Sequence, residues 1–130
     1  MRGWILDRKP HTHISEDRYE MKRFQDEAEA NGIDLRIFPP EVVDILVDRE
    51  QQDSIYVEGS PTELPDFVIP RMGAGTTYFT LAVIRQLERN GVFSVNSSSA
   101  IDTVKDKLYS QQILAQSNLP VPNVMVVKFP

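Results

Sequence analysis

The segment "DFVIPRMGAGTTYFTLAVIRQLERNGVFSV" (residues 66–95) has a strand–helix–strand pattern and decides the fold class. Its first apolar run lies between Pro65 and Pro70, which limit a short buried strand. A glycine-containing loop follows, and the helix-forming stretch from Thr77 to Asn90 ends before Gly91. The final residues, "VFSV", form a second apolar run. Two such strands joined by a helix predict a parallel sheet covered by helices.

The N-terminal third of the chain shows the same alternation of strand and helix. Residues 2–6 and 33–38 are predicted strands, and a pair of prolines ends the second. Between these strands, Ser15 is the predicted N-cap of a helix that stops at Asn31 and Gly32. Apolar residues at helical spacing form the predicted buried stripe of this helix, namely Met21, Phe24 and Ala28.

Residues 41–65 allow two interpretations. The apolar runs at 44–47 and 54–57 are separated by a polar segment, which indicates a β-hairpin. A single helical turn at 40–45 is the alternative, because proline favours the start of a helix.

The order of elements predicts a Rossmann-like α/β fold, with a mainly parallel sheet flanked by helices and a β-hairpin excursion. A capped helical turn at 96–104, a helix at 105–118 and a strand at 123–127 are predicted to follow. This last strand has no partner in the order. We therefore expect a domain at residues 1–97, with residues 98–130 forming a linker helix and the first strand of a truncated second domain.

Composition limits the functional classes. The chain has 130 residues and a net charge of −5, which disfavours a nucleic-acid-binding surface. The absence of cysteine excludes disulfides, a thiol nucleophile and cysteinyl zinc sites. The N-terminal residues 1–9 lack the long apolar region and the small-residue cleavage site of a secretory signal, and no apolar run approaches the roughly 20 residues that span a bilayer. We expect a cytoplasmic protein without membrane or nucleic-acid partners.

The loop "RMGAGTT" (residues 71–77) is the candidate site. No lysine follows Gly73 or Gly75 as a P-loop requires, and Tyr78 occupies the position of the third glycine of a dinucleotide fingerprint. Arg71 is expected at the carboxyl end of a strand, where open α/β sheets bind ligands. Two interpretations remain open: the loop binds a carboxylate or phosphate, or it is a turn in which Arg71 pairs with a neighbouring acid.

Several motifs resemble those of RimK-like ATP-grasp ligases, which add glutamate to a ribosomal protein and to related acceptors. The motifs are separated along the chain and occur in the family's order. They are "IPR-G" at 69–73, "LE--G" at 87–91, "VN" at 95–96, "DK---Q-LA" at 106–115 and the "LPVP" break at 119–122.

The resemblance implies that the first domain is a pre-ATP-grasp domain. The family's reaction uses ATP with Mg²⁺ (or Mn²⁺) to activate a carboxylate as an acyl-phosphate, which an amine attacks to form an amide. By the resemblance, Lys107 contacts the ATP phosphates. Arg71, Gly73 and Asn96 are expected at strand ends that face the cleft, and we assign them to binding the acid or amine substrate. The other nucleotide and metal residues of the family lie beyond residue 130. We therefore expect a fragment of a longer ligase, without catalytic residues, metal ligands or activity of its own.

A different class of function remains the alternative. The chain could be a non-catalytic Rossmann-like module that binds a small anion or mediates oligomer formation. The helix at Tyr78–Leu87 is apolar nearly all round at its start, which predicts a homo-oligomer contact. His11 and His13 lie in a polar segment without a nearby third ligand, so no metal site is expected there.

Overall fold

The computed structural model describes residues 1–8, 19–47, 49 and 54–128. A four-stranded parallel sheet forms in the order β2-β1-β6-β7. Its strands are β1 (Arg2–Leu6), β2 (Asp34–Phe38), β6 (Phe67–Pro70) and β7 (Phe93–Ser94). The helices α1 (Tyr19–Ala30) and α2 (Tyr78–Arg89) connect β1 to β2 and β6 to β7. The α/β fold, the parallel sheet and these six elements confirm the sequence prediction.

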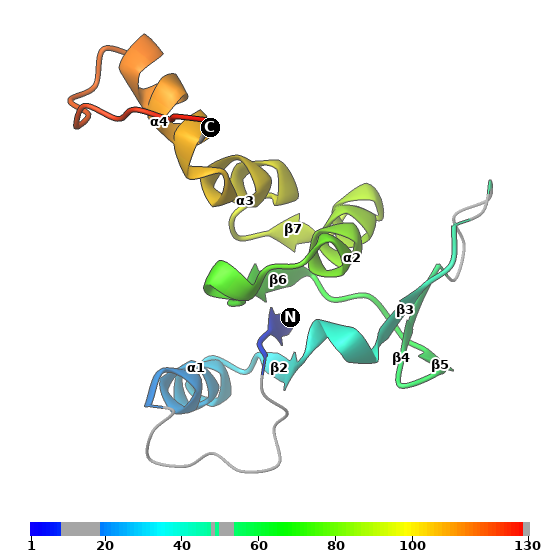
Figure 1. Cartoon of the computed structure of the whole chain (residues 1–130). Helices are drawn as coiled ribbons and strands as arrows, with labels where there is room; N and C mark the ends of the chain where they lie inside the picture. Colours follow the sequence, from blue (N-terminus) through cyan, green and yellow to red (C-terminus); the bar gives the residue numbers. More distant parts are fainter. Residues whose placement is uncertain (9–18, 48, 50–53, 129–130) are drawn as a thin grey trace. The chain divides into compact units, whose positions relative to one another are not determined.

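The strand order reverses at β1, because β2 lies on one side of it and β6 on the other. Right-handed crossovers that lead in opposite directions along a sheet place their helices on opposite faces. Figure 1 shows α1 and α2 on the two sides of the sheet. Ile5 and Ile37 pack with Met21 of α1 on one face. The adjacent residues of these strands, Trp4 and Phe38, point to the other face, where the centroids of their rings lie 5.1 Å apart in an edge-to-face contact.

Both helices end by the same mechanism, at an Asn-Gly pair. Gly32 has φ of +64°, which side chains other than glycine rarely adopt. The Ile33 amide donates to the Ala28 carbonyl at 2.8 Å, and the Gly32 amide donates to the Glu29 carbonyl at 3.1 Å. These two bonds form a Schellman motif. Gly91, with φ of +83°, ends α2 in the same way.

Residues 40–61 contain both features that the sequence allowed, a helical turn and a β-hairpin. A 3₁₀ turn, η2 (Pro40–Val42), leads directly into a small antiparallel sheet. The strands of that sheet are β3 (Val43–Ile45), β4 (Ile55–Val57) and β5 (Ser60–Pro61). Ser54 is buried, and its hydroxyl accepts hydrogen bonds from the side-chain amide groups of Gln86 (3.0 Å) and Asn90 (3.2 Å). This contact holds the hairpin against α2.

The chain divides into two compact units, residues 1–98 and 99–130. The last residue of the first unit, Ser98, donates from its amide (2.8 Å) and its hydroxyl (2.5 Å) to the carboxylate of Glu88 on α2. Helix α3 (Ser98–Lys105) begins there, and α4 (Lys107–Gln116) follows. The Asp106 side chain caps α4 by accepting from the Tyr109 amide at 2.9 Å.

The predicted strand at residues 123–127 does not form, because a strand needs a neighbour with which to share its backbone hydrogen bonds. Large apolar side chains in this segment are exposed, with Met125 the most exposed. The predicted helical turn at 96–104 is instead a helix of 8 residues, α3.

Most of the apolar side chains of α2 are buried within the first unit itself. Leu81, Val83, Ile84 and Leu87 are buried, whereas Tyr78 and Phe79 are exposed. The homo-oligomer contact therefore has a smaller apolar surface than the sequence suggests, and it stays a prediction. Within the described ranges, no helix is long and apolar enough to cross a membrane.

Replacement of Ile84 by alanine tests the packing of the buried face of α2. Ile84 is 0% exposed, so Ile84→Ala leaves a cavity that should lower the free energy of unfolding by about 2–5 kcal/mol. Tyr78→Ala is the matched control on the same helix, because Tyr78 is 80% exposed and its loss should cost less than about 0.5 kcal/mol. Urea denaturation measures both; equal losses would contradict the assigned buried face.

Candidate functional site

The carboxyl ends of β1 and β6 lie side by side where the strand order reverses. The Arg71 amide donates to the Leu6 carbonyl at 2.8 Å, and the Asp7 amide donates to the Phe38 carbonyl at 3.0 Å. The parallel ladder thus continues one residue past each strand. Open α/β sheets bind ligands in the crevice at such a reversal. Arg71, predicted from the sequence as a binding residue, is therefore at the position where this fold presents ligands.

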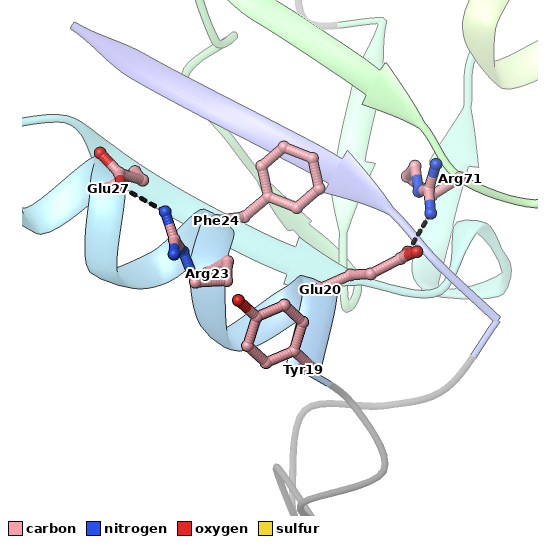
Figure 2. Close-up of a pocket in the computed structure, with 6 residues that line it drawn as sticks. All are labelled: Tyr19, Glu20, Arg23, Phe24, Glu27 and Arg71. Carbon is pink, nitrogen blue, oxygen red and sulfur yellow. Dashed lines mark hydrogen bonds and ion pairs between the residues drawn. The ribbon is translucent and has the colours of Figure 1, made fainter.

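Arg71 contacts the first turn of α1. Its guanidinium forms an ion pair with the carboxylate of Glu20. Figure 2 shows the two side chains pointing toward each other from the end of β6 and the start of α1. Of the two interpretations of the loop, pairing of Arg71 with an acid is present in the structure. The pair is partly exposed to solvent, so it is accessible to a ligand.

A hollow of about 450 Å³ opens beside this ion pair. We call it the α1 cleft. Its lining residues come from positions 19–27 of α1 and from the residue directly after β6, and they are Tyr19, Glu20, Arg23, Phe24, Glu27 and Arg71. The volume falls in the range of roughly 300–1,000 Å³ that small-molecule sites occupy.

A second ion pair lies further along the α1 cleft. Arg23 contacts Glu27 at 2.8 Å, and the hydroxyl of Tyr19 is turned toward Arg23 (Figure 2). The pKa of Arg23 is raised from its ordinary value, first by the Tyr19 hydroxyl and then by the charge of Glu27. Arg23 therefore stays positively charged, and the lining has two guanidinium groups and two carboxylates.

Glycine is required at two positions of the loop after β6 for different structural reasons. Gly73 begins the 3₁₀ turn η3 (Gly73–Gly75) with φ of +54°, so its backbone conformation favours glycine. Gly75 has no such conformation, but a Cβ at position 75 would overlap the guanidinium of Arg8. Arg8 follows β1 and is exposed. The loop thus brings a second arginine to the same edge of the sheet as Arg71.

The other predicted site residues are distributed over both units. Asn96 follows β7 at the carboxyl edge of the sheet, with φ of +72°, and its carbonyl accepts from the Ser94 hydroxyl at 3.1 Å. Gly73 and Arg71 share one loop. Lys107 is the first residue of α4 in the second unit and is exposed. His11 and His13 lie outside the described residues.

Helix α1 contributes to this site, which was not predicted from the sequence. The acidic face of α1 is easily taken for a solvated surface, yet Glu20, Arg23 and Glu27 line the cleft. Their spacing of three and then four residues places them on one face, which the sequence does show. No cluster of three or more His, Cys, Asp or Glu side chains suited to a metal ion occurs among the residues described.

Alanine substitutions separate the roles of the two glycines. Gly73→Ala should lower the free energy of unfolding by about 1–2 kcal/mol, because alanine is strained at positive φ. Gly75→Ala should change stability less, since the flexible Arg8 side chain can move aside. Denaturant unfolding checks both, and the cost of Gly75→Ala should fall further when Arg8 is also alanine. An unchanged cost in that double variant would contradict the contact.

Comparison with known proteins assigns a family. Residues 1–101 match the model of the RimK pre-ATP-grasp domain. A probable alpha-L-glutamate ligase of Legionella pneumophila (strain Corby) is 37% identical over 118 residues, which cover 91% of this chain and 37% of that protein. Probable alpha-L-glutamate ligase 1 of Shewanella denitrificans is 39% identical over 106 residues, 80% of this chain and 35% of that protein. The chain thus spans little more than a third of these relatives.

Solved structures support the fold. The ATP-grasp ligase PsnB, complexed with the precursor peptide PsnA2 and AMPPNP, superposes with a TM-score of 0.64 at 18% sequence identity, over 93% of this chain and 45% of PsnB. The family match covers residues 1–101, and the two ligase relatives align over 91% and 80% of this chain. This chain therefore belongs to the RimK pre-ATP-grasp domain family.

Proposed function

We propose that the chain is the pre-ATP-grasp part of an ATP-dependent carboxylate–amine ligase. The proposed reaction attaches an amino acid such as glutamate to a protein or small-molecule acceptor through an amide bond. The names of the relatives, which are probable alpha-L-glutamate ligases, support this proposal. Because the chain spans only 37% of the Legionella relative, the complete activity is proposed for a protein of which this chain is one part.

The observation that carries the proposal is the position of Arg71. Its guanidinium lies at the reversal of strand order and opens onto the α1 cleft. Guanidinium groups bind carboxylates with paired, charge-assisted hydrogen bonds. We assign Arg71 to substrate binding, with Gly73 and Asn96 as further contacts at the same edge of the sheet. In this assignment the first unit binds the amino acid that the reaction consumes.

Lys107 is proposed to contact the phosphates of ATP. It is exposed at the first residue of α4, where the Asp106 carboxylate is already engaged with the Tyr109 amide. A lysine there suits a phosphate as a point charge. The described residues provide no cluster for a magnesium ion, so Mg²⁺ is assigned to none of them. ATP bound with its metal supplies the phosphoryl group that activates the carboxylate.

A second function, a non-catalytic module that binds a small anion, is favoured by one observation. Arg8 and Arg71 both lie at the carboxyl edge of the sheet, beside the loop that contains Gly75. Consumption of ATP distinguishes the two functions, because a binding module consumes none. The cytoplasmic location stays a prediction.

An ATP-hydrolysis and amide-formation assay tests the proposal. We expect turnover with Mg²⁺ and L-glutamate from the product of the complete open reading frame. Lys107→Ala should lower kcat/KM for ATP by roughly 10–100-fold, the effect of losing a hydrogen bond to a charged group. Lys105→Ala is the matched control, since Lys105 is also exposed and ends α3 two residues earlier. Absence of turnover would contradict the ligase, and equal effects of the two variants would contradict the role of Lys107.

A further inference from the structure

We propose that the α1 cleft binds the zwitterionic head group of a free α-amino acid, with Arg71 on the α-carboxylate and Glu20 on the α-ammonium group. This inference rests on the proposed function and specifies the form in which the substrate is recognised. It adds Glu20 of α1 to the binding residues, beside the arginine that follows β6.

The charges of the cleft fit a zwitterion better than a simple anion. Its lining contains two arginines and two glutamates, which form two separate ion pairs, Arg71 with Glu20 and Arg23 with Glu27. An incoming phosphate would meet as many carboxylates as guanidinium groups. An amino-acid head group has one positive and one negative group, both attached to the α-carbon, and it can match both members of one pair.

The Arg71–Glu20 pair keeps the hydrogen-bonding capacity that such a ligand needs. The contact joins Nη2 of Arg71 to Oε2 of Glu20. A guanidinium has five donors and a carboxylate has two acceptor oxygens. Within the described part of the chain, neither side chain forms another hydrogen bond, and the two are 43% and 66% exposed. A head group can therefore bind alongside, without breaking the pair.

The other lining residues define how the ligand enters. Phe24 packs against the core beneath the cleft, while Tyr19 is exposed at its mouth. Figure 2 shows both aromatic rings between the two ion pairs. A ligand side chain that leaves the head group along α1 passes these rings and reaches Arg23, which lies one helical turn from Glu20. The cleft thus accommodates an amino acid whose side chain is several atoms long.

The test is an NMR titration of the ¹⁵N-labelled 130-residue chain with L-glutamate. We expect saturable amide shifts in residues 19–27 and at Arg71. N-acetyl-L-glutamate lacks the ammonium group, L-glutamic acid α-amide lacks the α-carboxylate, and inorganic phosphate is a simple anion. Each should bind at least tenfold more weakly than L-glutamate. Absence of saturable shifts with L-glutamate, or equal binding of phosphate or N-acetyl-L-glutamate, would overturn the proposal.

Variants separate recognition from a purely structural role of the ion pair. Glu20→Gln and Arg71→Gln should each weaken L-glutamate binding tenfold or more, with unchanged circular dichroism spectra. Lys22 and Asp26 form a similar pair at 2.9 Å on the same helix, outside the cleft. Lys22→Gln and Asp26→Asn should therefore leave binding unchanged. Equal losses from Asp26→Asn and Glu20→Gln would mean that any break in the charge pattern of α1 weakens binding, which contradicts the proposal.

The same variants distinguish this inference from the proposed function. If the complete protein consumes ATP with L-glutamate but Glu20→Gln leaves the KM for glutamate unchanged, the inference fails and the ligase stands. If the cleft binds L-glutamate as described but no ATP is consumed, the ligase fails and the binding site stands.

Discussion

The parallel pairing of β1 with both β2 and β6 is the constraint on which the rest of the first unit depends. Because the chain leaves the centre of the sheet in two directions, right-handed connections must place α1 and α2 on opposite faces. The carboxyl ends of β1 and β6 are then left between the two helices. The position of Arg71, its access to α1 and the loop beside Arg8 all follow from this one arrangement.

The strands and helices of the first unit could be predicted because their limits are local. Proline and glycine mark the ends of β6, α1 and α2, and the strands are short apolar runs between them. The segment at 123–127 is equally apolar, but a strand depends on a partner that local sequence does not supply. The start of the hairpin could not be predicted to the residue, because the turn at Pro40 and the strand at Val43 follow each other and are not alternatives.

The candidate site could be predicted only in part, for a related reason. The strand-end position of Arg71 follows from the order of elements, and the need for a residue that tolerates positive φ at Gly73 follows from its place in a turn. The pairing of Arg71 with Glu20 joins residues 51 positions apart. Nothing in the spacing of either segment indicates that the first turn of α1 faces the end of β6. The sequence also does not show why glycine is needed at position 75, because that need comes from the side chain of Arg8, which packs against it.

The hydrogen bonds between Glu88 and Ser98 connect α2 to the end of the first unit. This helix of 12 residues is about 18 Å long and starts directly after the glycine loop. Near its other end, Glu88 accepts a hydrogen bond from Ser98, the last residue of the first unit. A packed helix moves as a stiff rod rather than bending. Any shift of the loop that precedes α2 would therefore be carried by the helix to Ser98, the last residue of the first unit.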